Sequence, residues 1–264
     1  MRKLNLEEPR VQQAVDLYKS GLAIRPICKE LNMDGDALSN VLKQLGIYRS
    51  RSQAIRNGKG HGQINDHAFS ILIPEALYWI GYLFADGHIE KSRPRITVTT
   101  TKEDEEQMIN FAKYVNANVT YLKNDYIRVA FTSQEIYDKL VSLNFHNRKS
   151  YEIVVHPLLK YSRDFWRGCV DGDGWVFKTK YPVIGLCGLQ NTIQEFIDFL
   201  NLNAVDTKQV PNKVKKRESL YKCDFKCKKA IAIADLLYKD STVYLQRKYD
   251  TYRDFLNFSE EELV

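Results

Sequence analysis

The stretch CVDGDGW, residues 169–175, decides the fold of this chain, because it places two acidic residues at the end of a helix-compatible run. The segment before it, DFWRGCV (164–170), is aromatic and reads as a helix. Aspartates separated by single glycines are typical of a tight, cation-binding turn. A helix C-terminus already carries the negative end of the helix dipole, so two acids there require a counter-charge.

A calcium loop of the EF-hand type also opens with DGDG. Counted from Asp171, that loop requires glycine at its sixth position and glutamate at its twelfth. The chain has Val176 and Pro182 at these positions. The pattern therefore excludes an EF-hand loop.

The same pattern occurs earlier in the chain, in WIGYLFADGHI (79–89). Each copy is followed by segments whose periodicity predicts the order helix, two strands, helix, two strands, helix. The first copy occupies residues 79–89, 95–101, 103–115, 119–131 (a hairpin with Asn124-Asp125 at its turn) and 135–143. The second copy occupies residues 165–177, 182–189, 191–201, 206–213, 219–227 and 229–238. The sequence therefore predicts a duplicated domain.

Alignment of the copies superposes Gly81 on Gly168, Ala85 on Gly172 and Asp86 on Asp173. Small residues four positions apart lie on one helix face, where missing side chains allow two backbones to approach closely. If the two motif helices pack through these faces, their C-terminal acids converge. Two adjacent carboxylates repel each other and favour a hard cation such as Mg²⁺.

The segments WIGYLFADG and WRGCVDGDG resemble the paired motifs of LAGLIDADG homing endonucleases, in the form with both motifs on one chain. The resemblance covers residues 70–256. It implies an α+β fold, a pseudo-twofold duplicated αββαββα arrangement in which two antiparallel four-stranded sheets form a saddle over DNA and the motif helices form the central interface.

The resemblance also implies a metal centre. Asp86 and Asp173, the last acids of the motifs, would bind catalytic Mg²⁺ or Mn²⁺, with backbone carbonyls of Ala85 and Gly172 as further ligands. Phe84 departs from the motif, which has an earlier aspartate there, but that position is not a metal ligand in the family.

Members of the family place a lysine near the active centre, in a basic stretch after the last helix of each half. NRKSYEI (147–153) and LQRKYDTY (245–252) match this context and point to Lys149 and Lys248. A lysine there stabilises negative charge on phosphate or helps to position water. Gln190 corresponds to a polar residue that orders water. The alternative for either lysine is an ordinary solvated charge.

Strand alternation predicts the residues that face DNA, since side chains at every second position share one face of a sheet. Long basic and hydroxyl side chains on such a face suit phosphate and base-edge contacts, although they are also compatible with plain solvation. The set comprises Arg93, Arg95, Thr97, Thr99, Tyr126, Arg128, Lys178, Lys180, Lys208, Lys213, Lys215, Lys222 and Lys226.

The N-terminal residues 1–46 read as three short helices with helix-turn-helix spacing, and Asn32 is suited to a left-handed turn before the third helix. Residues 47–67 read as a basic linker, followed by repeats at 68–156 and 157–264. The residues expected to bind DNA here are Asp36, Ser39, Asn40, Lys43, Gln44, Arg49, Arg51 and Arg56. The alternative is a three-helix bundle with a structural or protein-binding role.

Composition sets weaker limits on function. A net charge of +6 suits an acidic polymer as partner without requiring one. The five cysteines include no CxxC pair, and the five histidines have no metal-ligand spacing, so the sequence indicates neither a disulfide framework nor a zinc nuclease. No apolar run is long enough to span a membrane. We therefore expect an intracellular, cytoplasmic protein of a bacterial or phage-infected cell.

Together these features predict a monomeric, site-specific double-strand DNA endonuclease. It would hydrolyse phosphodiester bonds with divalent metal at a long, asymmetric site, since the two halves differ so much in sequence. Two alternatives stay open. One is a transcription regulator that keeps the fold for binding DNA without cutting it, and the other is an RNA maturase that acts on a host intron RNA.

Overall fold

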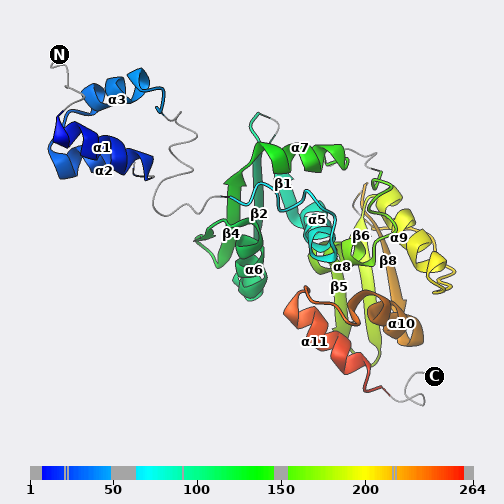
Figure 1. Cartoon of the computed structure of the whole chain (residues 1–264). Helices are drawn as coiled ribbons and strands as arrows, with labels where there is room; N and C mark the ends of the chain where they lie inside the picture. Colours follow the sequence, from blue (N-terminus) through cyan, green and yellow to red (C-terminus); the bar gives the residue numbers. More distant parts are fainter. Residues whose placement is uncertain are drawn as a thin grey trace. The chain divides into compact units, whose positions relative to one another are not determined.

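The computed structural model describes residues 8–20, 22, 24–48, 64–90, 92–145, 154–215, 217 and 219–258 of the 264-residue chain (Figure 1). The chain divides into two compact units with a boundary between Ile64 and Asn65. We describe each unit by itself.

The N-terminal unit contains α1 (Pro9–Lys19), α2 (Ile24–Leu31) and α3 (Gly35–Gln44). Asn32 has φ 47°, the left-handed conformation that the sequence predicts between α2 and α3. Asp34 then caps α3 by accepting a hydrogen bond from the Ala37 amide at 2.8 Å. The fully buried core residues of the unit are Val11, Ala14, Ile27, Leu38 and Leu42.

The first repeat has the predicted element order. Its elements are α5 (Pro74–Asp86), β1 (Gly87–Ile89), β2 (Arg95–Thr101), η1 (Lys102–Asp104), α6 (Glu105–Val115), β3 (Val119–Tyr121), β4 (Tyr126–Thr132) and α7 (Gln134–Ser142). The strands form an antiparallel sheet in the order β1-β2-β4-β3. Asn124 and Asp125 both have positive φ, 62° and 57°, so the predicted hairpin turn is confirmed.

The second repeat has the same connectivity. Its elements are α8 (Arg163–Asp173), β5 (Gly174–Lys178), β6 (Pro182–Gly188), α9 (Gln190–Leu202), β7 (Asn212–Lys213), β8 (Tyr221–Lys226), α10 (Cys227–Tyr238) and α11 (Gln246–Phe255). The sheet order β5-β6-β8-β7 matches that of the first sheet, and all pairs are antiparallel. The fold is thus α+β, with one αββαββα pattern stated twice.

Two elements of the second repeat differ from the sequence prediction. The strand expected over 206–213 is reduced to the two residues of β7. Pro211 has no amide hydrogen for a ladder, and Lys208 adopts φ 50°, which breaks an extended run. The stretch 245–252, expected only to be basic, lies largely in helix α11, whose buried residues Lys248, Tyr252 and Phe255 recur at helical spacing.

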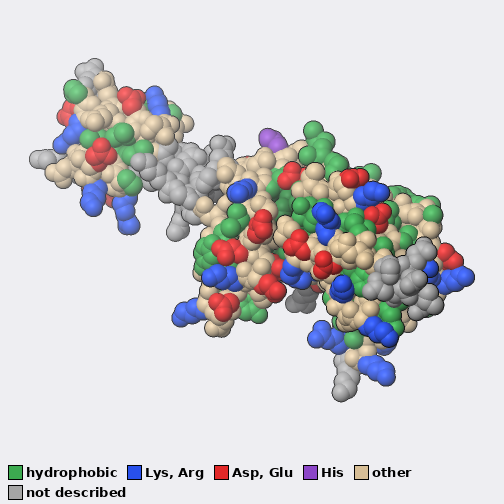
Figure 2. All heavy atoms as spheres, turned by 90° about the horizontal axis from the view of Figure 1, so that it is seen from below, with side chains coloured by type: hydrophobic (Ala, Val, Ile, Leu, Met, Phe, Trp, Pro, Cys, Tyr) green, Lys and Arg blue, Asp and Glu red, His purple; other side chains and the backbone are tan. Residues whose placement is uncertain are grey.

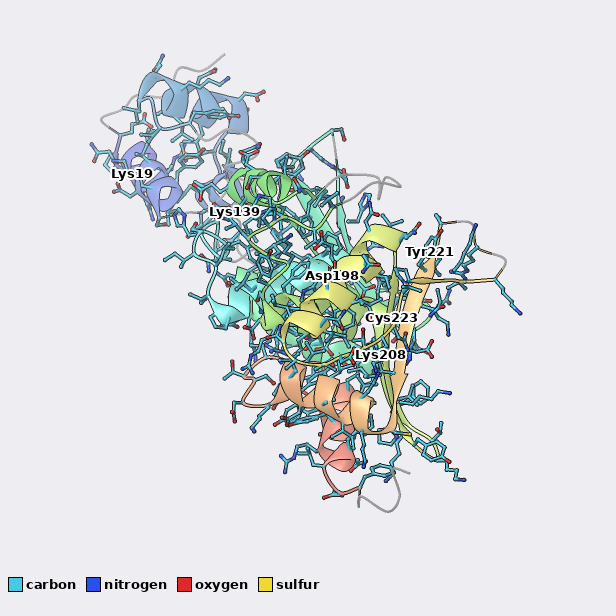
Figure 3. The ribbon with its side chains drawn as sticks, turned by 90° about the vertical axis from the view of Figure 1, so that its right-hand side faces the viewer. Lys19, Lys139, Asp198, Lys208, Tyr221 and Cys223 are labelled. Carbon is cyan, nitrogen blue, oxygen red and sulfur yellow. The ribbon has the colours of Figure 1, made fainter. Side chains whose placement is uncertain are left out.

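Helices pack against one face of each sheet in the described part of the chain. Helix α6 contacts β2, β3 and β4, whereas α9 and α10 contact β6 and β8. Figure 3 shows α9, which carries Asp198, beside strand β8 with Tyr221 and Cys223. We call the faces opposite these helices the open faces. They are the surfaces on which the sequence predicts contacts with DNA.

Candidate active site

Helices α5 and α8 touch each other through glycines, as the sequence predicts. A Cβ atom added to Gly81 would lie 2.9 Å from the carbonyl carbon of Phe165 and would overlap its oxygen. On the other side, a Cβ on Gly168 would overlap the carbonyl oxygen of Tyr78. Only glycine allows the two backbones to come this close, so these positions fix the separation of the repeats.

The two helices end on the two predicted acids. Helix α5 ends at Asp86 and α8 at Asp173. A Cβ on Gly172 would lie 3.3 Å from Asp86 Oδ2, so the Asp86 carboxylate lies against the last turn of α8. The structure therefore brings the end of α5 to the residue directly before Asp173.

A small cavity of about 50 Å³ lies beside Asp173. Ala85 and Cys187 are among its lining residues, and the Cys187 thiol donates a hydrogen bond to the Asp173 carbonyl oxygen at 3.1 Å. The volume is sufficient for a water molecule. Sequence reasoning did not single out Cys187, because a lone cysteine in a strand carries no spacing signal.

Lys248 reaches the end of α8 from helix α11 and is only 2% exposed. Its ammonium donates to the carbonyl oxygens of Val170, Asp171 and Gly174 at 2.6, 2.9 and 2.7 Å. These three acceptors use all three N–H groups, so Lys248 caps the helix from the inside and leaves no N–H for a phosphate in this arrangement.

Burial lowers the pKa of Lys248 to about 8, an effect that the negative charges of Asp171 and, to a smaller extent, Asp86 oppose. A positive charge therefore lies within electrostatic reach of the Asp86 carboxylate. It also offsets the negative end of the α8 dipole.

Asp171, the first acid of DGDG, is a buried hydrogen-bond acceptor. Its carboxylate accepts from the Tyr78 and Tyr238 hydroxyls at 2.7 and 2.6 Å and from the Leu245 amide at 2.7 Å. Burial raises its pKa, against the effect of Lys248. Asp171 thus ties α5, α8, α10 and the start of α11 together, a role that its position in a cation-type turn did not indicate.

The donor set at the helix ends fits a hard divalent ion. Asp86 and Asp173 supply one carboxylate from each helix end, and within the described residues no group of three or more His, Cys, Asp or Glu side chains could hold a metal ion. Mg²⁺ is commonly held by one or two carboxylates and completes its octahedron with water and substrate phosphate. Oxygen donors alone are what such an ion requires.

Two further residues, Gln190 and Lys149, were predicted to be catalytic. Gln190 is exposed and begins α9, directly after the second sheet's strand β6. Lys149 lies outside the described residues.

The open face of the first sheet carries the predicted polar set. The register places Thr97 opposite Ala130 and Thr99 opposite Arg128, whose Nε donates to the Thr99 hydroxyl at 3.1 Å. Arg95, Thr97, Thr99 and Arg128 therefore share one face, and Tyr126 continues it at the end of β4. Arg93 lies before β2 and pairs with Glu90.

The lysines predicted in the second repeat do not all share the open face. Lys222 and Lys226 do, on either side of Asp224. Lys178 follows Phe177 on β5 and therefore points to the helix-covered side, where its ammonium lies 4.6 Å from the Phe258 ring centre. Lys213 likewise alternates with Asn212, the partner of Lys222. Lys180, Lys208 and Lys215 lie in connections rather than in strands.

The helix-turn-helix prediction has the following counterpart in the structure. Asp36, Asn40, Lys43 and Gln44 are exposed on α3, and Ser39 is half-buried with its hydroxyl bonded to the Gly35 carbonyl at 2.7 Å. Arg49, Arg51 and Arg56 lie outside the described residues. Contact with DNA by this unit stays a prediction.

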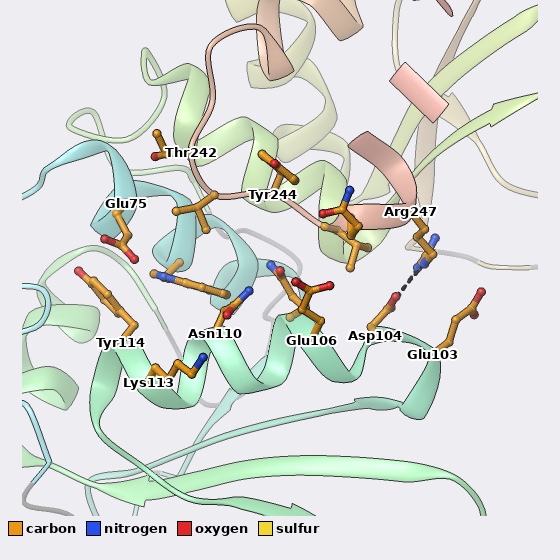
Figure 4. Close-up of a pocket in the computed structure, with 15 residues that line it drawn as sticks. Glu75, Glu103, Asp104, Glu106, Asn110, Lys113, Tyr114, Thr242, Tyr244 and Arg247 are labelled. Carbon is orange, nitrogen blue, oxygen red and sulfur yellow. Dashed lines mark hydrogen bonds and ion pairs between the residues drawn. The ribbon is translucent and has the colours of Figure 1, made fainter. Parts of the chain in front are cut away.

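A larger cavity, of about 580 Å³, lies between α6 and the segment before α11 (Figure 4). Glu75, Glu103 and Glu106 line it, and Arg247 forms a two-bond ion pair with Asp104 at 2.8 and 3.0 Å. This acidic lining does not suit a phosphate. Among described residues on the face drawn in Figure 2, basic and acidic side chains are interspersed.

Comparisons with known proteins give the following picture. No protein-family model matches the sequence, and no curated protein matches it. Solved structures similar to the chain include I-SmaMI bound to uncleaved DNA target in the presence of calcium ions (12% identity, 70% of this chain and 90% of that one, TM-score 0.47). They also include the LAGLIDADG meganuclease I-CpaMI bound to uncleaved DNA (11%, 70% and 90%, 0.48) and the LAGLIDADG homing endonuclease I-GzeII with its DNA target (14%, 70% and 88%, 0.44).

The fold assignment rests on the chain's own duplicated sheet order and on its two motif helices. One further structural finding concerns membranes: no helix among the described residues has the length and apolar character needed to cross one.

Proposed function

We propose that this chain is a DNA endonuclease of the LAGLIDADG homing endonuclease family, which cuts both strands of a long, asymmetric site with the help of divalent metal. The observation that supports this most directly is the glycine contact between α5 and α8, which brings the Asp86 carboxylate against the last turn of α8. Two acids at adjoining helix ends repel each other, and a bound divalent ion would offset that repulsion.

The residues at the helix ends would have distinct roles in this activity. Asp86 and Asp173 would hold Mg²⁺ or Mn²⁺, assisted by the carbonyls of Ala85 and Gly172. When bound, the ion supplies Lewis acidity toward the phosphate and a water of lowered pKa. Lys248 would act through α8, because its ammonium holds the last turn in place and keeps a positive charge beneath the acids.

The open faces would bind the duplex. Arginine and threonine side chains on the first sheet, together with Lys222 and Lys226 on the second, can position phosphates and reach base edges. The N-terminal unit would lengthen the site by binding DNA in its own right. The two sheets differ in sequence at nearly every open position, which favours a non-palindromic site and a monomeric enzyme.

The test is cleavage of DNA selected from a random library in the presence of Mg²⁺. We expect Asp86→Asn and Asp173→Asn each to reduce double-strand cutting at least about 100-fold, because each removes a charged ligand of the ion. Binding should persist, since neither change removes a basic contact. Asp198→Asn, an exposed acid on α9, is the matched control and should cut normally (Figure 3).

The same experiment separates the alternatives. A chain that binds selected DNA but cuts none of it with Mg²⁺ or Mn²⁺ is the transcription regulator. A chain that binds a structured intron RNA more tightly than any selected duplex is the maturase. Normal cutting by both Asp86→Asn and Asp173→Asn would contradict the metal centre.

A further inference from the structure

The open face of the second sheet contains a pocket that is lined by aromatic side chains. Its volume is about 420 Å³, and Trp175, Phe177, Tyr181, Lys222, Asp224 and Lys226 are among the residues that line it. We call this the aromatic pocket. Phe177 is 43% exposed, so its ring is open to a binding partner at the edge of the pocket.

Trp175 forms a fixed wall of the aromatic pocket. It stands opposite Gly185 in the register of β5 and β6, and a Cβ atom on Gly185 would overlap the indole ring. The indole therefore lies directly on the sheet in space that a side chain would otherwise fill. Glycine at 185 is thus required for the shape of the pocket as well as for the strand.

The charged residues of the aromatic pocket lie around the rings. The Lys222 ammonium lies 5.9 Å from the Trp175 ring centre and 2.7 Å from the Asp224 carboxylate. Lys226 adds a second positive charge, so the three charged groups together leave the pocket with one net positive charge. An apolar recess with a basic rim fits a ligand that has both an apolar group and nearby phosphates.

The first sheet has polar residues at the equivalent positions. The registers equate Trp175 with His88 and Gly185 with Thr97, because Gly87 and Gly174 begin β1 and β5. On the same basis Val183 corresponds to Arg95. At these three positions the first sheet therefore offers hydrogen-bonding side chains, whereas the second offers an indole ring, a glycine and a valine.

In the major groove of a DNA duplex, the thymine methyl is the only apolar group on the base edges. We propose that the aromatic pocket receives thymine methyl groups, so that the half of the DNA site bound by the second sheet is selected by apolar contact, whereas the half bound by the first sheet is selected by hydrogen bonds. This inference rests on the proposed DNA-binding function and names the base chemistry that the second sheet reads.

The test uses duplexes recovered by binding selection from a random library, resynthesised with uracil in place of thymine in one half at a time. Uracil pairs as thymine does but lacks the methyl group. We expect uracil in one half to weaken binding about fourfold for each methyl received, from the value of one buried methylene. Uracil in the other half should leave Kd unchanged.

Variants of the aromatic pocket test whether the uracil effect arises there. In Phe177→Ala or Trp175→Leu, the uracil penalty should disappear, because the pocket that receives the methyl is lost. Tyr121→Ala is the matched control: Tyr121 is an exposed strand aromatic, but its register partner Ile127 is a core residue, so it faces away from the open side. This variant should keep the full penalty.

Trp175 also gives a direct optical signal. Trp79 and Trp166 are fully buried, so Trp175 is the one partly exposed tryptophan among the three in the chain. DNA binding should quench its fluorescence, and Trp175→Leu should remove that change.

The outcomes separate the two levels of the proposal. Absence of any duplex binding would overturn the proposed function itself. Tight binding with no uracil penalty in either half, or a penalty that survives in both Phe177→Ala and Trp175→Leu, would overturn the inference alone. A third outcome is that duplexes with an abasic site bind more weakly, while uracil duplexes bind as tightly as thymine duplexes. This result would also overturn the inference about thymine methyl groups and would indicate that the pocket receives a whole base turned out of the duplex.

Discussion

Lys248 and Asp171 place opposite charges inside the protein at the end of α8. Each is almost fully buried, and each is held by three hydrogen bonds. Burying a charge is costly unless it is hydrogen-bonded and compensated by a nearby opposite charge, and Lys248 and Asp171 each influence the other's pKa in that sense. The arrangement fixes the backbone that leads into Asp173.

Replacing Lys248 tests this arrangement. Lys248→Met removes the ammonium, which leaves three buried carbonyls without their donor and Asp171 without its nearby cation. Although the cost of burying a charge is also removed, we expect the free energy of unfolding to fall by about 3 kcal/mol. Urea denaturation measures this. Lys239→Met, at an exposed lysine, is the control, and an equal effect of the two changes would contradict the internal cap.

The duplicated position occupied by Asp171 has a different residue in the first repeat. Phe84 stands there, and its ring packs on Phe145 and Phe165 with centres 5.5 Å apart in both cases. The same aligned position therefore accepts hydrogen bonds in the second repeat, through Asp171, and packs against aromatic rings in the first repeat, through Phe84. The sequence indicated that Phe84 departs from the motif, but the partners of Asp171 are too distant in the chain for any local pattern to identify them.

At the scale of elements, the contact between α5 and α8 determines the distance between the two acids. Gly81 and Gly168 lie where the backbones touch, so each has no space for even a methyl group. The first strand of each sheet, β1 or β5, follows its motif helix without a loop, so the position of each sheet depends on this helix contact. Any separation of the helices would therefore move both the acids and the open faces.

Gly81→Ala tests the contact. The added methyl must overlap the Phe165 carbonyl, so the helices have to shift, and we expect a loss of about 3 kcal/mol in the free energy of unfolding together with weaker cutting. Gly188→Ala is the matched control, because its nearest neighbour would be 3.7 Å from the new Cβ. Thermal unfolding of the two variants compares them. The contact would be refuted if Gly81→Ala were as stable as the control.

The sequence predicts those elements whose determinants are local. Periodicity identified the motif helices, glycine spacing identified their contact, and Asn32, Asn124 and Asp125 identified turns. Two kinds of feature escaped it. Helix α11 was obscured by its many charges, and strand β7 was overestimated because the ladder begins only after Pro211, whereas the expected strand began at residue 206.

The residues of the candidate site likewise fall into those with a local sequence signal and those without one. Asp86 and Asp173 carry a repeated motif and were identifiable, as was the placement of Lys248 near them. Cys187, and the tyrosines that bond Asp171, depend on contacts between elements far apart in the chain. Strand alternation predicted DNA contacts only for basic and hydroxyl side chains, so it did not predict the aromatic pocket.

At the scale of the whole molecule, the chain combines a net charge of +6 with open faces that carry arginines and lysines. Neutralising phosphates releases counterions from DNA, so affinity depends on salt. The acidic cavity between α6 and the segment before α11 lies on the helix side and does not contribute. Binding strength should therefore follow the open-face cations.

We expect log K for selected DNA to fall linearly with log salt, and Arg128→Gln to reduce the slope by about 0.9 if that guanidinium neutralises one phosphate. Lys139→Gln, at a partly exposed lysine on helix α7, is the control and should leave the slope unchanged (Figure 3). Fluorescence anisotropy over a salt series gives both slopes. A complex whose affinity ignores salt would contradict binding through the open faces.

Helix α11 comes after both sheets in the order of synthesis, yet it supplies the cation that secures the end of α8. A chain that ended at residue 240 would contain every strand of both sheets, but the last turn before Asp173 would lack its internal support. On the proposed function, such a shortened chain would keep the open-face residues expected to contact DNA but lose the cation that secures the end of α8.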